Sequence, residues 1–319
     1  MKIAILGAGS IARTMAYTMD KMDDVECYAV AARDHVRAKL FADEFGFEHA
    51  YGSYEAMVTD PEVELVYIAT PHSYHHEHTR LCLTHGKHVL CEKAFMATAW
   101  QAEEVIQLAR SRKLLLAEAI WTRYMPMRKI LDEVVASGII GDVYSLTANL
   151  GYVINHIPRL ADPALAGGAL LDVGVYPIHF ASMLFKDKIK HIASSAVLTE
   201  EGVDAQNNIA ITYEDGKMAV LHSSMMALTD RQGVIHGNKG FIAVKNINNC
   251  EAIEVYDLKR NLIQQHQRPP QITGLEYQVE ACIKAIRSGE VECPQMPHSE
   301  IIRISKLLDQ LRETWGASF

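Results

Sequence analysis

The chain has 319 residues, of which 49% are hydrophobic and 22% charged, as is typical of a globular protein with room for two domains. The net charge of −8 argues against a partner bound through a phosphate backbone. No uninterrupted apolar run is long enough to span a membrane. Because a strand begins at Lys2 and the six cysteines lack Cys-x-x-Cys spacing, we expect a cytoplasmic protein with reduced thiols.

The first predicted element is a short apolar strand, Lys2–Leu6, that runs into a glycine-rich turn, Gly7–Ala8–Gly9–Ser10–Ile11–Ala12. Gly7 permits a tight turn, and Gly9 presents no side chain to an approaching pyrophosphate. Ala12 lets the helix expected at Ser10–Asp20 pack closely on the strand. The free N–H groups at the start of that helix favour negative charge. The pattern therefore predicts a dinucleotide-binding site.

The second predicted strand, Val25–Ala32, is a continuous apolar run typical of a strand buried on both faces. It ends in Arg33–Asp34 where an NAD site would carry a carboxylate for the ribose 2′-hydroxyl. The Arg33 guanidinium can pair with a 2′-phosphate, which favours NADP, with NAD as the alternative cofactor. Asp34 suits the N-cap of a helix at Val36–Phe45. A plain surface arginine is the alternative interpretation of Arg33.

Strands and helices continue to alternate up to residue 120. The predicted elements are strands at His49–Tyr51, Leu65–Thr70, His88–Cys91 and Leu114–Ala119 and helices at Tyr74–His85 and Ala99–Arg112. Such alternation predicts a doubly wound parallel sheet with helices on both faces. We therefore expect an α/β dinucleotide-binding domain over residues 1–120.

In the second half, strands follow one another instead of alternating with helices. This order predicts an α+β domain over residues 121–319 with a large, mainly antiparallel sheet. The predicted elements are a helix at Met127–Ser137, a strand at Val143–Gly151, a helix at Leu170–Phe185, strands over residues 189–256, and closing helices at Gly274–Ser288 and Ser299–Thr314. We expect helices to cover one face of the sheet and the other face to stay open, with Met225, Met226 or Leu228 contributing apolar surface. An open apolar face favours a homodimer, alone or paired again into a tetramer, with a monomer as the alternative.

Polar residues follow the fourth and fifth strands, at the edge where doubly wound sheets bind ligands. Thr70–Pro71–His72 ends one strand and His75 begins the next helix, so we assign these residues to the cofactor. Glu92 and Lys93 end the following strand. The Lys93 ammonium could stabilise developing alkoxide charge and lower the pKa of a neighbouring acid or base.

A third polar group lies in the apolar segment that follows Gly167–Gly168. Asp172, Tyr176 and His179 are spaced i, i+4 and i+7, which places them on one face of a helix. This face could join a carboxylate, a phenol and an imidazole around one substrate. Pro177 is expected to distort the turn, because proline removes a backbone donor. An apolar core helix with a few satisfied polar residues is the alternative.

Six histidines lie between His72 and His88, which raises the question of a metal site. Neither a two-Cys-two-His spacing nor a helical His-x-x-x-His pair with a carboxylate occurs. We therefore assign no metal, and place His72 and His75 beside the cofactor.

With these groups in place, the chain resembles the Gfo/Idh/MocA family of glucose–fructose oxidoreductases, inositol dehydrogenases and rhizopine catabolism proteins. The matches span nearly the whole chain and are Gly7–Ala12, Thr70–Pro71 with His75, Glu92–Lys93, Glu118 with Arg123 and Pro126, and Gly167–Tyr176. The strings Ala31–Asp34, Glu118–Arg123 and Gly168–Asp172 are most similar to the branch of dimeric dihydrodiol dehydrogenases and NADP-dependent aldose dehydrogenases.

The resemblance implies a Rossmann-type first domain, a dimer, and a role for several residues. Lys93 would be the catalytic lysine, Tyr176 the proton donor or acceptor, and Trp121 a wall of the substrate pocket. Ala94 replaces the proline that relatives carry after this lysine, often in a cis bond. The assigned residues are Lys93, Tyr176 and Asp172 for catalysis; Gly7, Gly9, Ser10, Ile11, Ala12, Arg33, Thr70, Pro71, His72, His75, Glu92 and Lys93 for the cofactor; and Trp121, Arg123, Tyr176 and His179 for the substrate.

Two classes of function follow from these assignments. The first is an NADP-dependent oxidoreductase acting on a hydroxyl or carbonyl of a sugar, polyol or cyclic trans-diol. The second is a non-catalytic dinucleotide-sensing regulator or scaffold of the same fold. Such a regulator would be expected to have lost its lysine or its acid, whereas this chain keeps Glu92, Lys93, Asp172 and Tyr176. The sequence therefore favours the enzyme.

Overall fold

The computed structural model describes residues 1–318, which form two compact units. The first unit comprises Met1–Tyr124 and Gln271–Lys306. The second comprises Met125–Pro270 and the residues from Leu307 onward. Both predicted fold types, a doubly wound parallel sheet and a mainly antiparallel sheet, are confirmed in these units.

The first unit is built on a six-stranded sheet in the order β3-β2-β1-β4-β5-β6. All neighbouring strands pair in parallel. The strands are β1 (Lys2–Leu6), β2 (Glu26–Ala31), β3 (His49–Tyr51), β4 (Leu65–Ile68), β5 (His88–Glu92) and β6 (Leu116–Ala119). Strand order reverses between β1 and β4, and ligands bind at such a point in doubly wound folds.

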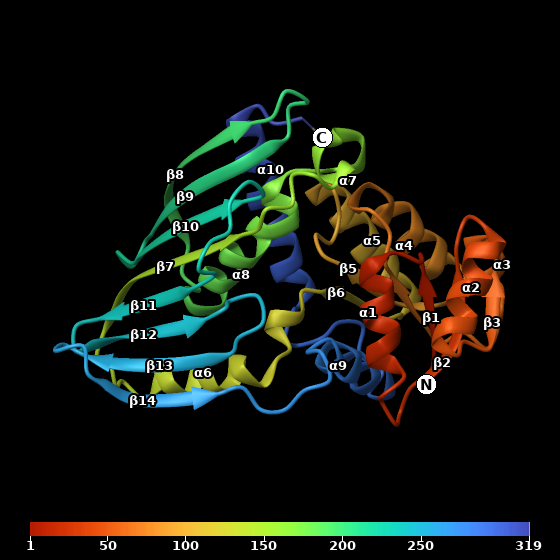
Figure 1. Cartoon of the computed structure of the whole chain (residues 1–319), viewed down its shortest axis with the longest axis horizontal. Coiled ribbons are helices and arrows are strands. Elements are labelled where there is room, and N and C mark those ends of the chain that lie inside the picture. The colour runs from red at the N-terminus through yellow and green to blue at the C-terminus, as the bar shows by residue number, and fades with distance from the viewer. Residues whose placement is uncertain (319) are drawn as a thin grey trace. The chain divides into compact units, whose positions relative to one another are not determined.

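Helices connect these strands (Figure 1). They are α1 (Ser10–Met19), α2 (His35–Phe45), α3 (Tyr54–Val58), α4 (His75–Thr84) and α5 (Ala99–Arg112), with the 3₁₀ turn η1 (His72–Tyr74) before α4. The 3₁₀ turn η2 (Trp121–Arg123) follows β6, and α9 (Glu276–Arg287) follows the second sheet in sequence. The predicted N-cap is present, because the Asp34 side chain accepts a hydrogen bond from the Val36 backbone N–H at 2.9 Å. The last helix, α10 (His298–Trp315), begins in the first unit and ends in the second.

The boundary between the units differs from the sequence-based division at residue 120. Residues Gln271–Lys306 belong to the first unit, although they follow the second sheet in sequence. Two hydrogen bonds tie this segment to β6. The Leu116 backbone N–H donates to Val291 O at 3.0 Å, and His298 Nε2 lies 2.9 Å from Leu116 O. These contacts join residues far apart in the chain, which composition alone does not reveal.

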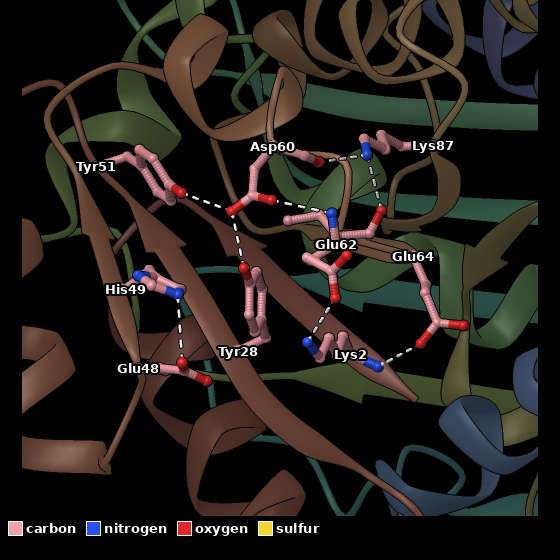
Figure 2. A network of polar contacts seen from close by, with 10 residues as sticks. Lys2, Tyr28, Glu48, His49, Tyr51, Asp60, Glu62, Glu64 and Lys87 are labelled. Carbon is pink, nitrogen blue, oxygen red and sulfur yellow. Dashed lines mark hydrogen bonds and ion pairs between the residues drawn. The ribbon is translucent and has the colours of Figure 1, made fainter.

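A polar network lies among β2, β3 and the turn before β4 (Figure 2). The hydroxyls of Tyr28 and Tyr51 both donate to Asp60 Oδ2, at 3.0 and 2.7 Å. The buried Lys87 ammonium donates to the backbone carbonyls of Asp60 and Val63 at 2.5 and 2.9 Å. Asp60 and Lys87 precede β4 and β5, so this network stabilises the end of the sheet opposite the carboxyl edge.

The second unit is built on an eight-stranded sheet in the order β14-β13-β12-β11-β7-β10-β9-β8. The strands are β7 (Val143–Gly151), β8 (Ile189–Leu198), β9 (Asp204–Tyr213), β10 (Met218–Ser224), β11 (Gly233–Gly237), β12 (Gly240–Lys245), β13 (Ala252–Asp257) and β14 (Leu262–Gln267). All pairs are antiparallel except β7 with β10.

Helices cover one face of this sheet. α8 (Val175–Leu184) contacts β7 and β10, and α6 (Pro126–Ala136) contacts β13 (Figure 1). The remaining helical elements of the unit, apart from α10, are α7 (Pro158–Ala161), η3 (Pro163–Leu165) and the π-helical η4 (Leu170–Gly174). By length and composition, Pro163–Leu184 could span a membrane, but 83% of its apolar window is buried inside the protein, as in a core helix.

The other face of the sheet exposes apolar side chains. Val197 on β8, Met218 on β10 and Val220 on β10 are 57%, 46% and 50% exposed. Met226 and Leu228 are also exposed, whereas the expectation for Met225 was wrong, because its side chain is only 1% exposed. The Met225 backbone N–H pairs with Ala205 O at 3.0 Å, which fixes the residue against the sheet.

Candidate functional site

The glycine-rich turn has the geometry that its sequence predicts. Gly7 has a φ of +106°, and a Cβ there would lie 2.8 Å from Ala69 O, so a larger residue would be strained. At Gly9 a Cβ would meet nothing within 4 Å, which leaves the backbone open to a ligand. Ser10 is exposed and begins α1, while Ala12 is completely buried against the sheet. The turn therefore offers free N–H groups at a helix N-terminus.

Two arginines follow β2, and one of them contacts this turn. Arg33 is exposed just after β2, and Arg37 on α2 donates from Nη2 to Ala8 O at 2.8 Å. The positive charges of both guanidinium groups affect the pKa of the Tyr54 phenol. Burial raises the pKa of Tyr54, and the two positive charges oppose that increase. Arg33 and Arg37 thus make the surroundings of Tyr54 electropositive.

Arg33 lines a pocket of about 620 Å³ at the carboxyl edge of the first sheet, together with Tyr54, Tyr74 and His78. The three rings form a cluster. His78 meets Tyr54 edge to face at 4.7 Å between centroids and stacks on Tyr74 at 5.8 Å. Burial lowers the pKa of His78 to about 4, so this imidazole is neutral near pH 7. Glu55, Pro71, Glu77 and Arg80 also line the pocket. A planar heterocycle that carries a phosphate fits the rings and Arg33.

The residues after β4 that the sequence assigns to the cofactor differ in how deeply they are buried. Thr70 Oγ1 lies 3.0 Å from His78 Nδ1. Pro71 lines the pocket, and His72 is buried at the start of η1. His75 is completely buried: its Nε2 lies 2.8 Å from Thr70 O, and its Nδ1 lies 2.9 Å from Ala94 O. His75 therefore bridges the backbones of the two segments that follow β4 and β5.

Two buried carboxyl groups, those of Glu92 and Glu118, accept hydrogen bonds from the backbone of the loop that carries Lys93. Glu92 accepts a hydrogen bond from the Tyr67 hydroxyl and another from the Lys93 backbone N–H, the latter at 3.2 Å. Glu118, which pairs with Cys91 in the sheet, accepts one from the Phe95 backbone N–H. Burial raises the pKa of Glu118 to about 7, opposed by Arg123. Lys93 itself is partly exposed, and the Lys93–Ala94 peptide bond is cis.

The residues after β6 differ in exposure. Trp121 begins η2 and is partly exposed. Arg123, assigned to the substrate by sequence, is 9% exposed and forms an ion pair with Glu300 at 2.6 Å. Burial lowers the pKa of Arg123, while the charge of Glu300 opposes this effect. This guanidinium is engaged by a carboxylate of its own unit.

In the second unit, Asp172, Tyr176 and His179 are all buried, at 7%, 8% and 0% exposure. The predicted single helix is divided, because Asp172 lies in the π-helical η4 and Tyr176 in α8. Arg159 on α7 donates to Asp172 Oδ1 at 2.9 Å. π-helical turns are rare in proteins, and those that occur often lie at functional sites. Among residues 1–318, no group of three or more His, Cys, Asp or Glu side chains could hold a metal ion.

Several residues of these sites were missed from the sequence. Arg37, Tyr54, Tyr74 and His78 enter the first unit's site only through the folding of α2, α3 and α4 onto one edge. Their order along the chain gave no signal, because no short motif links them. The four-residue spacing of Arg33 and Arg37 was the one local pattern that could have drawn attention to a second cation.

The sequence matches two family models. One, described as "Oxidoreductase family, NAD-binding Rossmann fold", covers residues 1–119, and the other, "GFO/IDH/MocA C-terminal domain", covers residues 129–243. The chain is 33% identical to the trans-1,2-dihydrobenzene-1,2-diol dehydrogenase of Mus musculus, over 100% of this chain and 98% of that protein. The Homo sapiens enzyme of the same name is 35% identical, over 91% of this chain and 89% of that protein.

Solved structures share the fold. KijD10, a 3-ketoreductase from Actinomadura kijaniata in complex with NADP and TDP-benzene, aligns with a TM-score of 0.87 and 26% identity over 98% of this chain and 97% of that one. An aldose-aldose oxidoreductase from Caulobacter crescentus, complexed with glycerol, aligns with a TM-score of 0.87 and 20% identity over 98% of each chain. The second likeness concerns the fold alone.

Proposed function

We propose that the protein uses NADP to oxidise or reduce a sugar, polyol or cyclic trans-diol, because the chain belongs to the Gfo/Idh/MocA family of NAD(P)-binding oxidoreductases. It is a dehydrogenase or reductase that acts on CH–OH groups. The substrate class follows the names of two similar proteins, a diol dehydrogenase and a 3-ketoreductase.

The observation that carries the choice of NADP is the pocket beside Arg33. Gly9 leaves the backbone of the turn open for a pyrophosphate, and the N-terminus of α1 lies directly after it. Tyr74 and His78 supply ring faces for an adenine, and Arg33 supplies a positive charge where β2 ends. After β2 the chain carries Arg33 where an NAD site would carry a carboxylate that holds the ribose 2′-hydroxyl.

When bound, the dinucleotide supplies or accepts the hydride. Lys93 then contributes a positive charge that stabilises a developing alkoxide, and Glu92 orients the backbone of Lys93. Tyr176 moves the hydroxyl proton as a general acid or base. Asp172, held by Arg159 at 2.9 Å, lies one turn before Tyr176 and completes the buried polar face of that segment.

We also propose that the protein is a homodimer that works in the cytoplasm. Val197, Met218 and Val220 lie on the face of the second sheet that α6 and α8 leave uncovered. Phe241 and Tyr256 stack on each other with centroids 4.8 Å apart, in the row that contains Met218 by strand register. A monomer rarely leaves such a surface bare, and a two-fold axis would cover it. The six cysteines are free thiols, which suits a reducing compartment.

Turnover distinguishes the enzyme from a non-catalytic regulator of the same fold. Purified protein is mixed with NADP or NADPH and a panel of aldoses, polyols, cyclic trans-diols and their keto forms, and absorbance at the nicotinamide band is followed. We expect steady turnover with at least one member of the panel. Tight binding of NADPH, measured by fluorescence, without turnover of any member would favour the regulator.

A further inference from the structure

Asp204 is a buried carboxyl group to which the sequence assigns no role. It begins β9 and is 3% exposed. Its Oδ2 accepts hydrogen bonds from the Leu170 backbone N–H at 2.8 Å and from Asn207 Nδ2 at 2.7 Å. Leu170 is the first residue of the π-helical η4 (Leu170–Gly174), so the carboxyl group caps the N-terminus of the segment that carries Asp172.

The polar chain continues to the other end of η4. Ser223 donates from Oγ to Asn207 Oδ1 at 2.9 Å, and the two residues are register partners on β10 and β9. A Cβ on Gly174 would lie 2.8 Å from Ser223 Oγ, so the last residue of η4 packs directly on that hydroxyl. Asp204, Asn207 and Ser223 together fix both ends of a five-residue turn against the sheet.

The fit around Asp204 is close. A Cβ on Gly168 would lie 2.4 Å from Asp204 Oδ1, and Gly168 has a φ of +100°, so only glycine suits this position. Burial raises the pKa of Asp204 to about 7, against the hydrogen bonds from Asn207 and Leu170 and the charge of Arg312. A buried carboxyl group is costly to desolvate, and apolar packing is often at least as stabilising. Its hydrogen bonds therefore point to placement of η4 as its role.

We propose that Asp204 is a positioning residue that sets the π-helical turn and thereby the placement of Asp172 and Tyr176. Asp172 lies inside the turn, and Tyr176 follows Gly174 by two residues on α8. Loss of the cap would let η4 relax toward a regular helix, which rotates both side chains relative to the sheet. The inference rests on the proposed function of Tyr176, but its structural part can be tested separately.

The structural part is measured by hydrogen exchange on the full-length protein without added ligand. Asp204→Asn keeps the shape of the side chain and one acceptor oxygen, but it removes the charge that the carboxyl group carries above its pKa of about 7 and so weakens the hydrogen bonds from Leu170 and Asn207. We expect exchange of the backbone amides of residues 168–176 to rise about tenfold, while residues 10–20 stay unchanged. Glu214→Gln, which removes an exposed carboxylate just after the same strand, should change neither segment. Unchanged exchange in residues 168–176 of Asp204→Asn would overturn the proposal, whether or not the protein turns over a substrate.

The catalytic part is measured by steady-state kinetics. We expect Asp204→Ala to lower kcat by about 100-fold and to leave the KM for NADP within about twofold, because a misplaced group harms the chemical step more than cofactor binding. In a Tyr176→Phe background, Asp204→Asn should cause little further loss of kcat, because its effect acts through Tyr176. Additive losses would contradict positioning, as would loss of folding in both Asp204 variants. An inactive wild type would count against the proposed function and not against the exchange result.

Discussion

Arg37 donates a hydrogen bond from Nη2 to the carbonyl oxygen of Ala8 at 2.8 Å, which fastens α2 to the glycine-rich turn. The two segments lie on either side of β2 in sequence, yet they meet at one edge of the sheet. Arg37 is thus engaged by a backbone carbonyl. Arg33, which directly follows β2, lines the pocket with Tyr54, Tyr74 and His78.

Cofactor preference should depend on Arg33. We expect Arg33→Ala to raise the KM for NADP by at least about tenfold, equivalent to about 1.4 kcal/mol, through loss of a charge-assisted contact with the 2′-phosphate. The KM for NAD should change little. Initial rates with each cofactor test this, and Lys39→Ala, which removes an exposed cation on the following helix α2, is the control. Equal losses with both cofactors would count against the assignment.

Lys93→Ala and Tyr176→Phe should each lower kcat far more than they weaken NADP binding. Removal of a proton-transfer group typically costs about 10²–10⁴-fold in rate. Cofactor affinity measured by NADPH fluorescence should stay within a factor of about three in the tyrosine variant. Activity within a few-fold of wild type in either variant would overturn the proposed roles.

The network around Asp60 should make stability depend on pH. Burial tends to raise the pKa of Asp60, but the hydrogen bonds from Tyr51, the Glu62 backbone N–H and Tyr28 outweigh it, so the net pKa is lowered. A lowered carboxyl pKa contributes stability above the unfolded-state value, and this is lost as pH falls through the folded-state pKa. The contribution is therefore full at pH 7 and absent in strong acid.

Asp60→Asn should consequently destabilise the protein at pH 7, by about 1 kcal/mol for the weakened hydrogen bonds, or about 2 °C in Tm. The difference from wild type should shrink as the pH falls below about 4. Thermal unfolding at several pH values tests this, with the exposed Asp23→Asn as the control. A constant difference in Tm across the whole range would refute the role of charge.

The open face of the second sheet should hold two copies together. We expect light scattering at micromolar concentration to give about twice the chain mass of 35.6 kDa. Val220→Asp places a charge on this face and should shift the mass toward the monomer, because a buried unpaired charge is costly. Glu214→Gln, which removes an exposed carboxylate in the turn after β9, should leave the mass unchanged. A wild-type mass near 35.6 kDa would contradict the dimer.

Local signals in the sequence predicted most of the fold. The glycine-rich turn, the Asp34 cap and the alternation of strands with helices depend on neighbouring residues, and all three occur as expected. The π-helical turn at Leu170–Gly174 was missed, because helical periodicity does not distinguish it from a regular helix. Assignment of Gln271–Lys306 to the first unit was also missed, since it depends on contacts with β6.

The candidate site was less predictable than the fold for the same reason. The sequence identified motif positions such as Lys93, but it did not show how deeply each side chain is buried. The assignments of His75 to the cofactor and of Arg123 to the substrate stay predictions. The sequence did not show that His75 is completely buried between backbone carbonyls or that Arg123 forms an ion pair with Glu300. Asp204 acts through a backbone N–H of Leu170, a contact that no motif encodes.

The central claim, NADP-dependent chemistry on a CH–OH group, is tested most directly by the ratio of kcat/KM for NADP to that for NAD. The ratio is measured on wild-type protein with the best substrate of the aldose, polyol and trans-diol panel. The pocket beside Arg33 predicts a ratio of at least about ten in favour of NADP. A ratio below one, or no turnover with either cofactor and any member of the panel, would contradict it.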